Sequence, residues 1–267
     1  MDGNSPLDDD TDGLAASKVV GTQTLVRGLA LLECVADGVS HVKGISTRLG
    51  TRRSTTHRML SSLVAEGYLH HVPHRGYTLG PQLIRLGQRA LEQRPIAGIA
   101  RRQIEELARR TSDTVHMGVL DGAKVLYLDK IPGTRGLEMR SRIGQQMPLA
   151  LTGLGKALMF GIPRERWKGL YEEALGLASP DAHPLAWPDY EAQLSEAAVR
   201  GWAYDLEENE LGIRCVAAPV HDISGGIVAA ISISSPIFYM AEAQMRELGP
   251  VIRATADAIS RDLGWES

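Results

Sequence analysis

The sequence predicts an α+β protein in which an N-terminal winged helix-turn-helix is followed by a short linker helix and by a C-terminal domain built on an antiparallel sheet. Three observations lead to this prediction. Three short amphipathic segments precede a hairpin signal, a Gly-Pro break follows the hairpin, and strands joined by tight turns alternate with helices over the remainder. The chain has 267 residues, 43% of them apolar, which is enough for two compact domains.

The start of the chain differs from the rest in composition. Residues 1–16 carry five acidic side chains, no basic one and no apolar periodicity. Such a segment buries too little apolar surface to fold, so we expect a disordered acidic leader over residues 1–20. A basic start followed by an apolar run is also missing, so no secretory or import signal is expected and the predicted location is the cytoplasm.

Three short helices are predicted before residue 67. The apolar residues of the first recur at helical spacing, at Leu25, Leu29, Leu32 and Ala36. The second is marked by Ile45 and Leu49 and closes at Gly50, and the third extends from about Thr51 to Gly67. Three short helices in this order are typical of a helix-turn-helix.

A β-hairpin is predicted directly after the third helix. Residues 68–72 and 77–79 are rich in β-forming side chains and flank a turn that contains Pro and Gly. This hairpin would be the wing that completes a domain over residues 21–80. An amphipathic segment then predicts a linker helix over residues 81–95, which places the last domain at residues 96–267.

The last domain is expected to combine antiparallel strands with separate helices. Strands are expected at residues 115–120, 125–130, 137–141, 203–209, 214–220 and 227–234. Helices are expected at residues 99–110, 154–161, 164–175, 188–200 and 241–263. The longest mostly apolar stretch, residues 227–240, is interrupted by three serines and a proline, so it is too short and too polar to span a bilayer and no membrane partner is predicted.

Charge is distributed unevenly along the chain. Residues 17–94 carry eleven Lys/Arg against four Asp/Glu, whereas residues 95–267 carry eighteen against twenty-three. A local excess of positive charge attracts polyanions, so the N-terminal domain is the one expected to bind a nucleic acid.

The third predicted helix has a polar face suited to DNA. If Leu60 points into the core, a rotation of about 100° per residue places Ser54, Thr55 and Arg58 on the opposite side. Arg58 can donate a forked pair of hydrogen bonds to a guanine edge, and the hydroxyls can contact a base or a phosphate. The predicted DNA contacts are Arg52, Arg53, Ser54, Thr55, His57 and Arg58, with His74 and Arg75 at the wing tip. For each of these residues taken alone, the alternative is that it belongs to an ordinary solvated helix or turn surface and contacts no DNA.

The sequence gives little support for metal or catalytic chemistry. His70 and His71 are adjacent in a predicted strand and point to opposite faces, so they cannot easily share an ion. Gly155 and Lys156 lack the Ser/Thr that completes a phosphate loop, and no G-x-S-x-G motif occurs. No catalytic residue, metal or cofactor is therefore predicted. A cysteine-dependent enzyme centred on Cys215 is the alternative.

Motifs in both halves of the chain resemble those of the IclR-type transcriptional regulators. In the N-terminal half they occupy residues 45–50, 54–60 and 63–69. In the C-terminal half they occupy residues 119–122, 127–130, 153–158, 207–210, 214–220 and 229–234. The resemblance covers about residues 22–264. It implies a GAF-like effector domain, a homodimer or a homotetramer that is a dimer of dimers, and control of an operon, more often by repression, through an organic or aromatic acid.

The resemblance also implies a ligand cavity in the C-terminal domain. The positions that line this cavity in the family correspond to Gly153, Leu154, Asp205, Cys215, Ser232 and Ser234, to which we add Met139 as an apolar wall. Ser232 and Ser234 are two apart in a strand and share a face. The helix that starts after Thr152 offers free N–H groups to a carboxylate. For each of these residues taken alone, the alternative is an ordinary structural role without any contact to a ligand.

One departure from the family concerns the residues before Thr152. The family has more polar residues where this chain has Leu149, Ala150 and Leu151, which predicts a more apolar pocket. The predicted function is a transcriptional regulator whose affinity for double-stranded operator DNA is controlled by a small-molecule effector. A purely architectural DNA-binding dimer without ligand sensing is the alternative.

Overall fold

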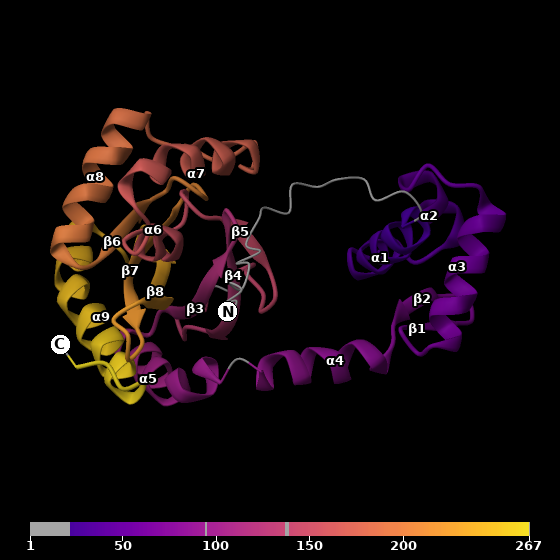
Figure 1. Ribbon diagram of the computed structural model, residues 1–267, viewed down its shortest axis with the longest axis horizontal. Helices are drawn as coiled ribbons and strands as arrows, with labels where there is room; N and C mark the ends of the chain where they lie inside the picture. Colours follow the sequence, from indigo (N-terminus) through magenta and orange to yellow (C-terminus); the bar gives the residue numbers. More distant parts are fainter. Residues whose placement is uncertain (1–21, 94, 137–138, 267) are drawn as a thin grey trace, which may run out of the picture. The chain divides into compact units, whose positions relative to one another are not determined.

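The computed structural model describes residues 22–93, 95–136 and 139–266 (Figure 1). Its contacts divide the chain into two compact units, and the division falls between Ala90 and Leu91. The acidic leader predicted for residues 1–20 lies outside the described residues.

The N-terminal unit has the winged helix-turn-helix architecture that the sequence predicts. Its elements are α1 (Gln23–Ala36), α2 (Val42–Arg48), α3 (Arg53–Ala65), β1 (Leu69–Val72) and β2 (Gly76–Leu79). The two strands pair antiparallel and form the wing. The fully buried side chains of the small core are Leu31, Ile45, Leu60 and Leu69. The next helix, α4 (Pro81–Glu92), contains the division between the units.

The wing is fixed to the connection between α1 and α2. Gly76 has a φ of 86°, and a Cβ at this position would lie 2.3 Å from the carbonyl oxygen of Ser40. The N–H of Tyr77 donates to the same oxygen at 2.8 Å. Glycine alone tolerates both the left-handed angle and the close approach, so the position of the wing depends on Gly76.

The C-terminal unit is built on one antiparallel sheet. Its helices are α5 (Ile96–Thr111), α6 (Gly153–Met159), α7 (Arg164–Gly176), α8 (Trp187–Arg200) and α9 (Glu242–Asp262). Its strands are β3 (Thr114–Asp121), β4 (Lys124–Ile131), β5 (Gln146–Pro148), β6 (Ala203–Leu206), β7 (Ile213–His221) and β8 (Ile227–Pro236). The strand order is β5-β4-β3-β8-β7-β6, which confirms the α+β prediction.

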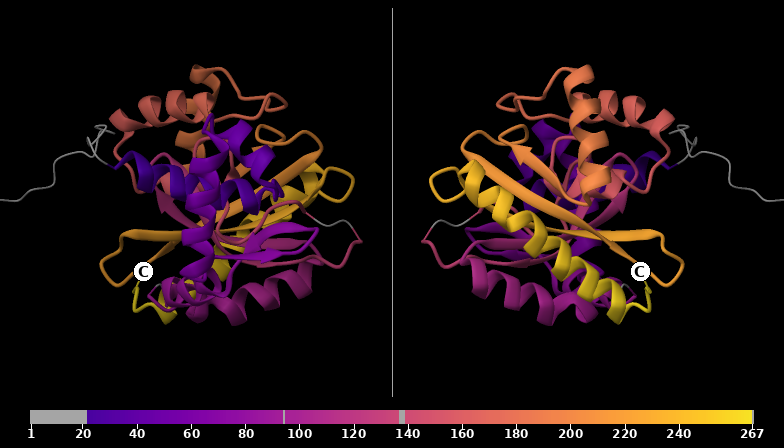
Figure 2. Two further views of the ribbon diagram at one scale, coloured as in Figure 1. Left: turned by 90° about the vertical axis from the view of Figure 1, so that its right-hand side faces the viewer. Right: turned by 90° about the vertical axis from the view of Figure 1, so that its left-hand side faces the viewer.

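Helices cover both faces of this sheet. Figures 1 and 2 show α5 and α9 along one face, and α6, α7 and α8 over the other. Residues of β7 alternate between two apolar cores, with Val216 and Ala218 facing α5 and α9 and Ala217 facing the α6 side. Because side chains alternate along a strand, the odd positions of β7 and the even positions of β8 share the α6 face. This alternation decides which polar residues of the sheet can meet a ligand.

Two strand predictions differ from the structure. In the strand predicted at 137–141, residues 137 and 138 lie outside the described residues, and residues 139–141 form a loop whose carbonyls accept from a lysine instead of a strand partner. The strand predicted at 203–209 ends at Leu206, because Glu207 has a φ of 73° and turns the chain. The short strand β5 was not predicted.

None of the helices within the described ranges combines the length and the apolar character that a membrane crossing requires.

Candidate functional site

Helix α3 separates a buried face from an exposed polar face. Leu60 and Thr56 are fully buried and fix the orientation of the helix in the N-terminal core. Ser54, Thr55 and Arg58 are exposed, as is His57. The residues proposed to contact DNA therefore lie on the solvent side, where a major groove can be approached.

The start of α3 is positively charged and free to bind anions. Arg52 and Arg53 are exposed, and no residue in the described ranges forms an ion pair with either of them or with Arg58. By contrast, the nearby Arg48 pairs with Asp37 at 2.6 Å. No side chain caps the first turn of α3, so its N–H groups remain available to phosphate oxygens.

The wing tip presents the other two predicted contacts. His74 and Arg75 are both exposed, and His74 has a φ of 64° at the turn of the hairpin. His70 pairs with Thr78 and His71 with Tyr77 across the hairpin, so the two histidines project from opposite faces. Within the described part of the chain, no group of three His, Cys, Asp or Glu side chains has the arrangement of a metal site.

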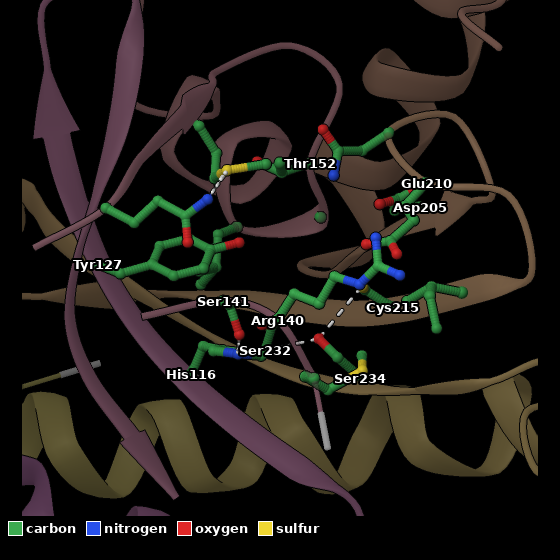
Figure 3. Close-up of a pocket in the computed structure, with 17 residues that line it drawn as sticks. His116, Tyr127, Arg140, Ser141, Thr152, Asp205, Glu210, Cys215, Ser232 and Ser234 are labelled. Carbon is green, nitrogen blue, oxygen red and sulfur yellow. Dashed lines mark hydrogen bonds between the residues drawn. The ribbon is translucent and has the colours of Figure 1, made fainter. Parts of the chain in front are cut away.

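A cavity of about 90 Å³ lies on the α6 face of the C-terminal sheet (Figure 3). All seven residues predicted for the effector site line it: Met139, Gly153, Leu154, Asp205, Cys215, Ser232 and Ser234. The register of the sheet explains this convergence, since Cys215 lies opposite Ser234 on neighbouring strands. The cavity is thus bounded by sheet residues, the start of α6, the turn after β6, and the loop of residues 139–145.

Several lining residues were not predicted. They are His116, Tyr127, Arg140, Ser141, Gln145, Met147, Thr152, Asn209, Glu210 and Ile213. His116 lies opposite Ser232 across the β3–β8 pair. Period-two alternation places His116 on one face of its strand, but the pairing of strands so distant in sequence is a tertiary property that alternation does not reveal.

A line of hydrogen bonds crosses the floor of the cavity. Cys215 Sγ lies 3.2 Å from Ser234 Oγ, which lies 3.3 Å from His116 Nδ1. His116 Nε2 lies 2.7 Å from Ser141 Oγ. Burial, together with the positive charge of Lys130, lowers the pKa of His116 to about 3. The imidazole is therefore neutral, with one nitrogen donating and the other accepting. The line connects three strands to the loop that carries Ser141.

Asp205 combines a structural contact with a place in the cavity. Its Oδ1 accepts from the N–H of Glu208 at 2.9 Å, so it caps the turn after β6. Burial raises the pKa of the Asp205 carboxyl to about 7, and the carboxylate of Glu208 adds to the increase against the opposing charge of Lys156. The buried end of the cavity therefore disfavours negative charge.

The Cys215 thiol lies beside Asp205 and is protonated. Burial raises the pKa of this thiol far above its usual range, and the carboxylate of Asp205 adds to the effect. Because the thiolate is the nucleophile, this environment disfavours the reactive form of Cys215. The geometry gives no support to the alternative of a cysteine-dependent enzyme.

Lys156 supports the turn beside the cavity. Its buried Nζ donates to Glu208 Oε1 at 2.5 Å, to Gln193 Oε1 at 2.8 Å and to the carbonyl oxygen of Tyr204 at 2.9 Å. With all three of its protons engaged inside the protein, this lysine is not available to a phosphate.

The start of α6 offers fewer free groups than predicted. Thr152 Oγ1 accepts from the N–H of Gly155 at 3.0 Å and so occupies one of the donors that were expected to face a ligand. Leu149, Ala150 and Leu151 are fully buried in the core beside α6, and none of them lines the cavity. The prediction that these three residues make the pocket more apolar is therefore wrong.

A DNA-binding face on a winged helix-turn-helix, together with a ligand-sized cavity in a separate domain, defines the class of ligand-responsive DNA-binding proteins. The family profile of the IclR helix-turn-helix domain matches residues 24–73, and that of the bacterial transcriptional regulator IclR C-terminal domain matches residues 88–261. The chain belongs to the IclR family of bacterial transcriptional regulators.

Similar proteins support this assignment over nearly the whole chain. The HTH-type transcriptional regulator XynR of Escherichia coli K12 is 32% identical over 91% of this chain and 98% of its own length. The DNA-binding transcriptional repressor YiaJ of the same organism is 34% identical over 92% of this chain and 89% of its own. The crystal structure of the Thermotoga maritima IclR superposes with a TM-score of 0.72 at 28% identity, covering 91% of this chain and 99% of that one. The predicted function, a DNA-binding transcriptional regulator with an effector domain, is confirmed.

Proposed function

We propose that this regulator is a repressor whose affinity for operator DNA is controlled by a small organic or aromatic acid bound in the C-terminal cavity. One observation carries the proposal: seven residues chosen from the sequence, on five different segments, converge on one cavity. Hydroxyl, thiol and imidazole groups form a hydrogen-bonded line on its floor, so a ligand with polar ends finds directional partners there. The regulator acts in the cytoplasm, where its operator lies, and no catalytic step is assigned to it.

The cavity volume sets the size of the ligand. A volume of about 90 Å³ well exceeds the roughly 10–15 Å³ that one water molecule needs, so the cavity can hold a small ligand of several heavy atoms. A solved IclR homolog from Microbacterium hydrocarbonoxydans, 22% identical with a TM-score of 0.75 over 90% of this chain and 99% of that one, is complexed with 4-hydroxybenzoate. That aromatic acid is a small molecule with a polar group at each end, and it is the first probe we would use.

In this proposal the exposed face of α3 enters the major groove. Arg58 contacts a base edge, Ser54, Thr55 and His57 contact bases or phosphates, and Arg52 and Arg53 contact phosphates. His74 and Arg75 at the wing tip reach the neighbouring backbone or groove. A homodimer, or a dimer of dimers, places two such faces on two half-sites, with the segment around residues 83–91 fixing their separation.

The experiment that tests ligand sensing is a thermal-shift screen of small aliphatic and aromatic acids. A ligand that binds only the native state stabilises it by about 2.7 kcal/mol at one hundred times its dissociation constant, so a binding acid raises the melting temperature. The double substitution Ser232→Ala with Ser234→Ala removes two floor hydroxyls and should abolish that rise while leaving DNA binding intact. If no acid in the screen stabilises the wild type, the proposal fails and the architectural alternative is favoured.

A further inference from the structure

Arg140 is the one arginine among the described residues that line the cavity, and it has no ionic partner there. Two other arginines of this unit do have carboxylate partners, Arg135 with Asp113 at 2.7 Å and Arg214 with Glu207 at 3.1 Å. Neither Asp205 nor Glu210, the two carboxylates of the cavity lining, forms an ion pair with Arg140. Figure 3 shows the Arg140 side chain extended across the cavity, on the side of Asp205 and Cys215 in this view. A guanidinium that lines a ligand cavity without a counterion is available to an anion.

The backbone of Arg140 is held on both sides. Lys130 Nζ donates to the carbonyl oxygen of Met139 at 2.6 Å and to that of Ser141 at 2.8 Å. Ser141 Oγ is in turn bonded to the neutral imidazole of His116. The base of the arginine side chain is therefore positioned before any ligand arrives, which reduces the entropy lost on binding.

The start of α6 is a poor rival for an anionic group. A Cβ on Gly153 would lie 3.1 Å from Cys215 Cβ and 3.7 Å from Asp205 Cβ, so the helix start packs beside the Asp205 side chain. A ligand carboxylate placed there would be buried next to a group that already resists ionisation. Arg140 is exposed, so a carboxylate beside it keeps part of its hydration and gains a counterion.

We propose that Arg140 binds the carboxylate of the effector at the exposed side of the cavity, while an uncharged hydroxyl at the other end of the effector bonds to Asp205 or Ser234 on the floor. The inference rests on the proposed function, in which this cavity takes a small organic acid. It narrows the ligand to hydroxy acids and phenolic acids, and it assigns specificity to a residue outside the set predicted from the sequence.

The test compares acids with their uncharged amides in two variants of the full-length protein. The probes are 4-hydroxybenzoate and 4-hydroxybutyrate, each paired with its amide, and binding is measured by calorimetry. The variants are Arg140→Gln and the matched control Arg142→Gln, which removes an exposed arginine of the same loop that does not line the cavity. Arg140 forms no ion pair in the described structure, so Arg140→Gln should melt at the wild-type temperature without ligand.

We expect each acid to bind the wild type and Arg142→Gln with equal affinity, and its amide to bind the wild type at least about tenfold more weakly. In Arg140→Gln, the affinity for the acid should fall by about tenfold to a hundredfold, while the affinity for the amide should stay unchanged. Arg140→Lys should recover part of the loss, because it restores the charge without the planar fork. If Arg140→Gln binds the acids as tightly as the wild type, or if amides bind the wild type as well as acids, the Arg140 assignment is overturned while ligand sensing stands. If neither acid nor amide binds the wild type and the wider screen also yields no ligand, both the Arg140 assignment and the proposal of ligand sensing are overturned.

Discussion

Arg58 and Arg53 both project from the exposed side of α3, yet at the residue scale they should contribute differently to DNA binding. Arg58→Ala removes a proposed base contact and should weaken operator binding by about 1–3 kcal/mol while relaxing discrimination at one base pair. Arg53→Ala removes a proposed phosphate contact and should weaken binding to operator and to random DNA alike. The slope of the logarithm of the binding constant against the logarithm of the salt concentration should become shallower by about 1. Fluorescence anisotropy with an operator selected from a random pool, over a range of salt, distinguishes the two. Unchanged discrimination in Arg58→Ala would mean that this face does not read the sequence.

Asp205 should give the folded protein a recognisable pH dependence. Because its pKa is raised to about 7 in the folded state, folding favours the protonated form. This contribution is fully present below the unfolded pKa of about 3.9 and is lost as the pH rises through 7, with a slope of up to about 1.4 kcal/mol per pH unit. Asp205→Asn keeps an oxygen for the Glu208 N–H and should flatten this component in urea unfolding between pH 5 and 8. Parallel profiles for the two proteins would contradict the shifted pKa.

At the scale of elements, the wing depends on a glycine that has a matched control in the same unit. Gly76 and Gly38 both have positive φ, 86° and 87°, but only Gly76 faces a backbone oxygen that an added Cβ would strike. Gly38→Ala should cost about 1–2 kcal/mol for the left-handed angle alone. Gly76→Ala should cost clearly more and displace the wing from the α1–α2 connection. Equal losses in chemical denaturation would show that the contact with Ser40 contributes nothing.

The conformation of the loop of residues 139–145 should depend on Lys130. Lys130→Met removes both hydrogen bonds to the loop carbonyls, so the loop amides should exchange hydrogen faster and acids should bind more weakly. Lys124→Met is the control, because Lys124 lies on the same strand but bonds to Gln146. Exchange rates in Lys130→Met that match those of the wild type would show that the lysine does not hold the loop.

Elements with strong local signals could be predicted from the sequence, and those made by distant pairing could not. The end of α1 at Asp37 and Gly38 and the hairpin at Asp121 and Gly122 follow from local turn chemistry. The short strand β5 is defined by its pairing with the edge of β4, so no local sequence pattern predicts it. Likewise Arg140 and His116 reach the cavity through loop conformation and strand register, while Ser232 and Ser234 could be paired from their spacing alone.

At the scale of the whole molecule, regulation by a ligand requires that binding in one domain be energetically coupled to binding in the other. An acid bound in one domain can change DNA affinity in the other only if it binds the DNA-competent state with a different affinity from the other state. The same coupling must then appear in both directions, so operator DNA must change the affinity for the acid by the same factor. This reciprocity separates a sensor from a protein that merely contains both a DNA-binding face and a cavity.

The most direct test is therefore the operator dissociation constant of the full-length protein, measured with and without a saturating acid that the thermal screen has shown to bind. We expect the operator dissociation constant to change by about 5-fold to 150-fold in the wild type and not at all in the Ser232→Ala, Ser234→Ala variant. If an acid binds the cavity yet leaves the operator dissociation constant unaltered, the protein is not a regulator controlled by that cavity.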